Sequence, residues 1–167
     1  MKSTAISAQG TKLYVSEKAF VTDGDTQKAV ADAIEVNNLR SFKGFDGQAT
    51  EVDVTNLSSE AKEYLVGLQD YGNLVIDVDR DFSDKGQQAL KADKGGPSIR
   101  NFLLIFPNAS AAKFRGFAKN TPLEGGVDQT IKSTGLTIRI TGPVDIVQLK
   151  RPEETKTDGG QKKEGVE

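Results

Sequence analysis

The sequence contains no histidine, no cysteine and no tryptophan. Without cysteine the protein has no disulfide, thiol nucleophile, zinc finger or iron–sulfur cluster. Without histidine it has no serine–histidine triad, no imidazole acid or base and no haem–histidine ligation. Any chemistry would depend on carboxylates, lysines, hydroxyls or the backbone. These absences argue against most classes of enzyme, and we expect no catalytic residues, metal or cofactor.

The charge is nearly balanced, because 22 lysines and arginines stand against 24 aspartates and glutamates. The sequence therefore lacks the strong basic excess that is typical of proteins that bind nucleic acids. Residues 1–6 lack the apolar core of a secretory signal. The longest apolar run, residues 102–106, is far shorter than the ~20 residues that cross a bilayer. We expect a protein that is made in a cytoplasm and does not insert into a membrane.

The length of 167 residues fits one ordinary domain. Residues 151–167 contain a single aliphatic side chain, Val166, among lysines, glutamates, glycines and threonines. Such a segment cannot bury enough apolar surface to offset the entropy lost on ordering. We therefore predict a folded domain over residues 1–150 and a flexible polar C-terminal tail over residues 151–167.

The folded part shows a period of two. Leu74, Ile76 and Val78 alternate with polar neighbours, which predicts a strand with one buried face over residues 74–82. Similar patterns predict strands at 113–118 and 136–141, and weaker ones at 12–21, 30–37 and 51–55. Residues 102–106 are apolar on both faces, so this strand is expected to be central or covered from both sides.

Two short helices are predicted between the strands. Ser58 or Ser59 could cap a helix that runs through Leu65, and Asp81 or Ser83 could cap another that runs to residue 91. Because strands outnumber helices and turn signals separate them at hairpin spacing, we predict a mainly β (α+β) fold. The expected architecture is an antiparallel β-sandwich or open barrel with one flanking α-helix.

Asp77, Asp79 and Asp81 place carboxylates at alternate positions, which is similar to part of a calcium-binding loop. Such a loop requires a glycine and a glutamate where this sequence has Phe82 and Gln88. The polar face of a strand that leads into a helix explains the pattern better. A carboxylate enzyme remains a minor alternative, although nothing in the sequence indicates a pocket around these acids.

The charges fall into two blocks. Residues 51–93 hold ten acids and four bases, whereas residues 94–119 hold five bases and no acid. The blocks could pair with each other across neighbouring strands of one subunit. Alternatively, they could lie on opposite surfaces and drive head-to-tail association between subunits. Lys113 and Arg115, in the basic block, are candidate contacts in the second case.

The order of segments resembles that of one family of viral structural proteins. Residues 51–57 followed by 61–70 resemble its pattern D-V-T-x-L … K-E-Y-x-x-G-L-x-D-x-G, in which Gly72 supplies the last glycine. The family is the tail tube protein, or major tail protein, of long non-contractile-tailed bacteriophages (siphophages), the lambda-like tail tube family. The other segments that match in order are 4–13, 74–79, 100–108, 114–117 and 136–144.

The resemblance implies a structural subunit of the virion that is not an enzyme. The subunits of this family assemble as homohexameric rings, which stack into a tube through which DNA is ejected. The implied partners are the protein itself and the tape-measure, tail terminator and tail tip proteins, while DNA passes without sequence-specific binding. The implied location is the virion tail, after synthesis in the host cytoplasm.

Two sets of candidate residues follow from this resemblance. Tubes of this family tend toward electronegative channels, which bind DNA phosphates poorly, so Asp77, Asp79 and Asp81 are candidate channel-lining residues. The loop 41–47 is expected to expose two aromatic side chains for contacts between rings or subunits. The candidate contact residues are Phe42, Lys43, Phe45, Lys113 and Arg115. Alternatively, Phe42 and Phe45 fold back as a lid on the core.

Two other functions remain open at this stage. The protein could form the tube of a contractile or secretion apparatus, which shares the fold implied by the resemblance. It could also be a carbohydrate-binding β-sandwich module, although three tyrosines and no tryptophan are a poor supply of exposed aromatics for sugar binding.

Overall fold

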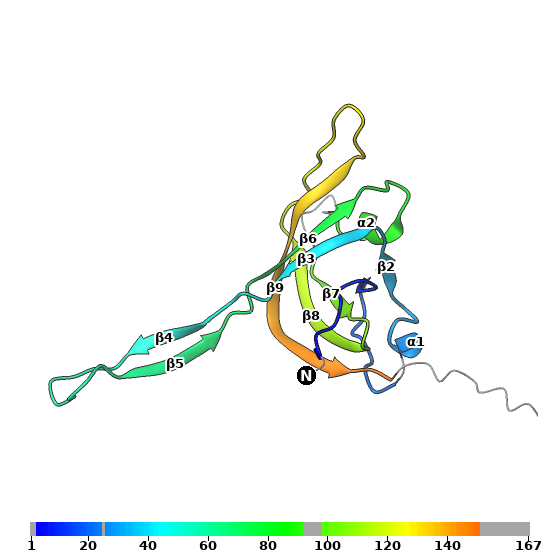
Figure 1. Cartoon of the computed structure of the whole chain (residues 1–167). Helices are drawn as coiled ribbons and strands as arrows, with labels where there is room; N and C mark the ends of the chain where they lie inside the picture. The colour runs from blue at the N-terminus through cyan, green and yellow to red at the C-terminus, as the bar shows by residue number, and fades with distance from the viewer. Residues whose placement is uncertain (1–2, 25, 92–97, 151–167) are drawn as a thin grey trace, which may run out of the picture.

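The computed structural model describes residues 3–24, 26–91 and 98–150 (Figure 1). Its two helices are α1 (Thr26–Ala29) and α2 (Lys85–Ala89). Its strands are β1 (Lys12–Ser16), β2 (Ile34–Val36), β3 (Leu39–Gly44), β4 (Ala49–Asp53), β5 (Tyr64–Gln69), β6 (Asn73–Asp79), β7 (Arg100–Ile105), β8 (Ser110–Ala118) and β9 (Lys132–Gln148). The tail predicted at 151–167 lies outside the described residues.

Seven strands form one antiparallel sheet in the order β2-β1-β7-β8-β9-β6-β3. The sheet curls on itself into a half-barrel (Figure 1). The strands β4 and β5 form a separate two-stranded sheet. The predicted mainly β, antiparallel open-barrel fold is confirmed, with two short helices among the described residues instead of one flanking helix.

The inside of the half-barrel is the core. Because side chains alternate between the two faces of a strand, every second side chain of β6 and β9 packs against this core. The polar neighbours therefore face outward. Phe102 and Phe114 stack at its centre with 5.3 Å between ring centroids. Other buried members are Leu13, Val15, Val36, Leu74, Ile76, Val78, Leu104, Leu136 and Ile138.

Strand β7 is covered on both faces, as its sequence indicates. Phe102 and Leu104 point into the main core, whereas Leu103 lies in a second apolar cluster on the other side. This second cluster includes Phe20 and Ala29, so the segment around α1 covers the outer face of the sheet there. The apolar run at 102–106 is therefore accounted for within a single subunit.

The outermost strands β2 and β3 are joined by only two residues, Asn37 and Asn38. Helix α2 packs against β2 and contacts the corner at Asn37, and we call this contact region the seam. Its N-cap Asp84 accepts hydrogen bonds from the side-chain amide of Asn37 at 2.6 Å and from the backbone N–H of Gln87 at 2.9 Å. Gly86 lets the helix approach closely, because a Cβ there would lie 2.0 Å from the carbonyl oxygen of Glu35.

Gln87 is the polar centre of this seam and is only 1% exposed. Its side-chain amide donates to the carbonyl oxygens of Asn37 at 3.0 Å and Asp79 at 2.9 Å. Its side-chain oxygen accepts from the backbone N–H of Asp81 at 3.1 Å. One buried side chain thus connects the corner between the edge strands to the end of β6.

The helix predicted from Ser58 or Ser59 through Leu65 is wrong. Residues 54–63 form the end of a hairpin, and Tyr64 begins strand β5. Local hydrogen bonds hold the hairpin end, such as Ser59 Oγ to the Glu63 carboxylate at 2.9 Å. The predicted helix near residues 83–91 is confirmed as α2, although its cap is Asp84 and not Asp81 or Ser83.

Two of the weaker strand predictions, 12–21 and 30–37, need shorter bounds, and the third, 51–55, begins and ends two residues earlier as β4. Strand β1 ends at Ser16, β2 begins at Ile34, and α1 occupies part of the segment between them. Across the described ranges, the helices fall well short of the length and apolarity that spanning a membrane would require.

Candidate assembly surfaces

The hairpin of β4 and β5, with its connecting residues 54–63, projects from the half-barrel as a long arm (Figure 1). Among the described strands, these two pair only with each other. Apolar side chains on the arm are nevertheless exposed: Val66 is 81% and Leu68 88% accessible. The other exposed members are Val52, Val54, Leu57, Tyr64 and Leu65.

An isolated two-stranded hairpin is only marginally stable in water, and exposed apolar patches mark sites of protein contact. The arm therefore has the properties of a segment that packs on another molecule. It is also acidic, since residues 49–69 contain four acids (Glu51, Asp53, Glu60 and Glu63) and one base (Lys62). Any surface that receives the arm should therefore be apolar and basic.

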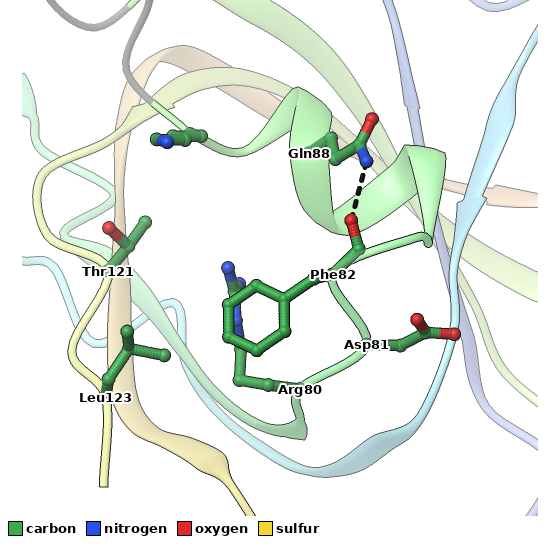
Figure 2. A pocket seen from close by; sticks show the side chains of 7 residues that line it. Arg80, Asp81, Phe82, Gln88, Thr121 and Leu123 are labelled. Carbon is green, nitrogen blue, oxygen red and sulfur yellow. Dashed lines mark hydrogen bonds between the residues drawn. The ribbon is translucent and has the colours of Figure 1, made fainter.

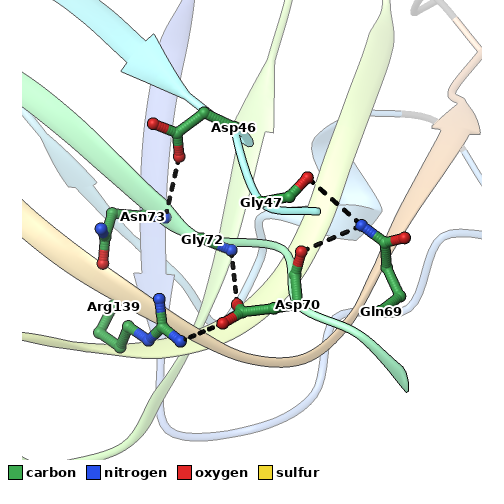
Figure 3. Close-up of polar contacts among 7 residues, drawn as sticks. All are labelled: Asp46, Gly47, Gln69, Asp70, Gly72, Asn73 and Arg139. Carbon is green, nitrogen blue, oxygen red and sulfur yellow. Dashed lines mark hydrogen bonds and ion pairs between the residues drawn. The ribbon is translucent and has the colours of Figure 1, made fainter. Parts of the chain in front are cut away.

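Polar contacts fix the arm at its base (Figure 3). One oxygen of Asp70 accepts from the backbone N–H of Gly72 at 2.8 Å, and the other accepts from Arg139 of β9 at 2.6 Å. The Gly72 hydrogen bond, followed by that of Arg139, lowers the pKa of the Asp70 carboxyl group below its ordinary value. These contacts connect the point where the chain leaves β5 to the half-barrel.

The two chain segments at the base of the arm lie in close contact. Gln69 reaches across and donates from its side chain to the carbonyl oxygen of Gly47 at 3.4 Å. A Cβ on Gly47 would lie 1.9 Å from the carbonyl oxygen of Asp70 and 2.4 Å from the nitrogen of Gly72. Only glycine allows this approach, so Gly47 helps to set the direction of the arm.

The acids Asp77 and Asp79 alternate with the buried Ile76 and Val78 on β6, and so point away from the core. Asp77 accepts from the Ser41 hydroxyl and from the backbone N–H of Gly135, both at 2.7 Å. The Ser41 hydrogen bond is the main reason that the pKa of Asp77 is lowered, and Gly135 adds to it.

Asp79 and Asp81 also have local partners. Asp79 lies 3.4 Å from the guanidinium of Arg40 on β3. Asp81 follows the end of β6, and its Oδ1 accepts from the hydroxyl and the backbone N–H of Ser83 at 2.6 and 2.9 Å. These two contacts lower the pKa of Asp81. Only Asp77 and Asp79 therefore belong to one outward face of the sheet.

The prediction that Phe42 and Phe45 are exposed in a loop is wrong. Phe42 lies on β3 with its ring centroid 5.9 Å from that of Phe106. Phe45 packs edge-on against Phe114 at 5.5 Å. Both rings are half-buried against the main core, as the lid alternative describes. Lys43, between them, is exposed.

Lys113 and Arg115 lie on β8, where the register with β9 shifts. They line a cavity of about 270 Å³ together with Phe20 and Asp145. Strand β9 separates β8 from β6, so the basic and acidic blocks do not meet across neighbouring strands. None of the four ion pairs between described residues joins the two blocks.

Sequence reasoning missed two features. The first is the arm, whose signal was the β-favouring run from Tyr64 to Leu68 directly after a polar turn. The second is Arg80, whose guanidinium lies over the ring of Phe82 at 5.5 Å from its centroid. The local sequence does not distinguish this arginine from a solvated one, because part of its surroundings, Thr121 and Leu123, comes from a distant segment.

Comparison with known proteins agrees with this architecture. A chain of the structure titled "Cryo-EM structure of the anti-feeding prophage (AFP) baseplate, 6-fold symmetrised" superposes with a TM-score of 0.58 at 10% identity. The match covers 90% of this chain and 99% of that chain, and at such low identity it shows the fold alone. Comparison with individually curated proteins gave no match.

The antiparallel half-barrel, with two short helices among the described residues, is consistent with the fold of phage tail tube proteins. The family model described as "Phage tail tube, TTP, lambda-like" matches residues 4–98, which is more than half of the sequence. The chain therefore belongs to the lambda-like family of phage tail tube proteins. It is a structural component of a phage tail and not an enzyme.

Proposed function

We propose that the subunits assemble into six-membered rings, and that the rings stack into a tube through which DNA leaves the virion. The observation that carries this proposal is the β4–β5 arm, whose apolar side chains are exposed and whose strands pair only with each other among the described residues. Six-fold symmetry is supported by the shared fold with a chain of a baseplate structure that was six-fold symmetrised.

The outward face of β6 is the proposed channel wall. Asp77, whose pKa is lowered, and Asp79 supply carboxylates to this face, and a negative wall repels the phosphates of a passing duplex instead of binding them. Asp81 lies beyond this strand and is the weakest of the three candidates. The polar face also suits a tape-measure protein inside the tube, while terminator and tip proteins would bind its two ends.

Among the candidate contacts, the exposed Lys43 and the pair Lys113 and Arg115 are proposed to meet neighbouring subunits. Phe42 and Phe45 already cover the core, so they would contribute through the exposed edges of their rings. Synthesis in the host cytoplasm, followed by assembly into the virion tail, fits a subunit that is folded before it meets its partners.

Electron microscopy and analytical ultracentrifugation test this function. The purified protein at high concentration is expected to form tubes with a central hole. The variant Leu57→Ser/Val66→Ser/Leu68→Ser should keep the melting behaviour of the subunit but remain monomeric, because it removes apolar contacts that lie outside the core. A wild-type protein that stays monomeric at all concentrations, or a variant that still forms tubes, would contradict the proposal.

The channel wall has a separate test. Replacing Asp77 and Asp79 with lysine should leave the tubes able to assemble but make them retain DNA in a salt-dependent way. The control is Lys18→Glu, which changes the charge of a residue that follows the end of β1. Tubes of the lysine variant that bind no more DNA than wild type would show that this face is not the channel.

A further inference from the structure

Arg80 has an unusual environment for an arginine at the end of a strand. Its backbone N–H donates to the carbonyl oxygen of Ile131 at 2.9 Å, which fixes its position beside the segment that leads into β9. Its Nε and Nη1 atoms are buried and, among the described residues, have no hydrogen-bond partner. Buried donors without an acceptor are destabilising, so this guanidinium is suited to receive an acceptor from outside.

The guanidinium lies beside a cavity of about 450 Å³, which is within the size range of binding pockets (Figure 2). The lining residues are Arg80, Asp81, Phe82, Gln88, Lys91, Thr121 and Leu123. Phe82 and Leu123 are 60% and 57% exposed, although both are large apolar side chains. The cavity therefore combines two cations and one carboxylate, Asp81, with an exposed apolar rim.

Two of the other polar groups of the cavity already have partners. The Gln88 side chain donates to the carbonyl oxygen of Phe82 at 2.7 Å (Figure 2). Asp81 accepts from Ser83. The cationic groups that line the cavity are the guanidinium of Arg80 and the ammonium of Lys91, and Thr121 adds a hydroxyl. Their chemistry matches a carboxylate on an apolar segment, because a guanidinium presents parallel N–H donors to the two oxygens of a carboxylate.

We propose that this cavity, the Arg80 pocket, receives the β4–β5 arm of a second copy of the chain. The arm carries four acids and one base together with exposed apolar side chains, which complements the pocket in both respects. The arm of the same subunit cannot occupy it, since it extends away from the half-barrel and from α2 (Figure 1). The inference rests on the proposed self-assembly and names the receiving site.

Glu60 and Glu63, near the end of the arm, are the carboxylates assigned to this contact. Both are exposed in the subunit. In the complex, the Phe82 ring would continue to cover one face of the guanidinium, while its N–H edge turns to the carboxylate. Such a contact is heterologous, because the arm of one copy meets the pocket of the next and does not meet the same arm.

Charge reversal on both sides tests the contact. The variant Arg80→Asp has an acidic pocket and an acidic arm, and the variant Glu60→Lys/Glu63→Lys has a basic pocket and a basic arm. Each variant alone should stay monomeric by analytical ultracentrifugation at concentrations where wild type assembles. An equimolar mixture should assemble again with the two variants alternating, because every arm then meets a pocket of opposite charge.

Thermal unfolding of each variant shows that the subunit is folded before assembly is scored. If Arg80→Asp does not fold, Lys91→Asp reverses an exposed charge of the same pocket and takes its place. The control Lys18→Asp makes the same change of net charge at an exposed lysine outside the pocket and should assemble as wild type does.

The outcomes separate this inference from the proposed function. Wild type that never assembles contradicts the proposed function itself. If wild type and Arg80→Asp each assemble equally well, the assigned role of the Arg80 pocket is overturned and the proposed function is not. This conclusion holds whether or not DNA binding has changed. An arm variant that assembles normally, or a mixture of two folded variants that stays monomeric, overturns the pairing of arm and pocket.

Discussion

Arg139 of β9 and Asp70 at the base of the arm are joined by an ion pair of 2.6 Å. The pair connects the half-barrel to a hairpin that otherwise pairs only with itself among the described strands. Both side chains are partly exposed, so their contribution to the stability of the whole subunit is small. Their effect is on the direction of the arm.

We therefore expect Arg139→Gln to leave the melting temperature close to that of wild type but to slow assembly. Hydrogen exchange should become faster in β5 and at Gly72, because the base of the arm opens more often. Arg40→Gln, which removes a similar exposed ion pair on β3, is the matched control. Unchanged exchange in β5 would show that Arg139 does not hold the arm.

Gln87→Leu is expected to destabilise the subunit by about 1–3 kcal/mol or more, because it leaves the carbonyl oxygens of Asn37 and Asp79 without a buried donor. Urea unfolding measures the change. The neighbouring variant Gln88→Ala alters an exposed side chain of the same helix and should cost much less. Equal losses for the two variants would argue against a special role for the seam.

Asp77 predicts an acid-dependent loss of stability. Its hydrogen bonds with Ser41 and Gly135 lower its pKa in the folded state below the ordinary aspartate value of 3.8. The stabilisation is therefore present above pH 3.8 and is lost as the pH falls through the lower folded pKa. Thermal unfolding of wild type and Asp77→Asn should differ at neutral pH and converge in acid. A difference that persists undiminished in strong acid would refute this assignment.

Gly47→Ala should destabilise the base of the arm by about 1–3 kcal/mol, since the new methyl group would overlap the backbone of Asp70 and Gly72. Gly125→Ala is the control, because the nearest atom to its Cβ would be 3.8 Å away on Ile131. Chemical denaturation should show a clear shift for the first variant and almost none for the second.

Phe45→Ser should lower the free energy of unfolding of the single subunit by about 1–2 kcal/mol, because its half-buried ring packs on Phe114. Lys43→Ser, on the adjacent exposed position, should have little effect on unfolding. A loss of assembly caused by Phe45→Ser would thus reflect the core as well as any interface. Unaltered stability would restore the exposed-loop interpretation.

The sequence was informative where a local pattern reports a local environment. Leu74, Ile76 and Val78 alternate with polar residues because one face of β6 is buried, and this is visible without a structure. The prediction of a helix from Ser58 to Leu65 was wrong, although glutamate, alanine and lysine favour a helix locally. Residues 64–69 form a strand instead, because they pair with residues 49–53.

The candidate site was less predictable for a similar reason. The pocket of Arg80 is lined by nearby residues such as Phe82, but it is completed by Thr121 and Leu123, some forty residues later in the sequence. Phe45 is covered because it meets Phe114, which is still more remote along the chain. Burial that depends on such distant partners produces no periodic pattern of apolar residues in the sequence around either residue.

The two-residue link between β2 and β3 has a consequence for the shape of any assembly. Because the outermost strands of the sheet share this short corner, the half-barrel cannot flatten without breaking the contacts of Asp84 and Gln87. The curvature of each subunit's sheet is therefore fixed by the short covalent link between β2 and β3 and by the buried hydrogen bonds of Asp84 and Gln87. The inner diameter of a ring built from such subunits would be a property of the folded monomer, already determined before the first two subunits meet.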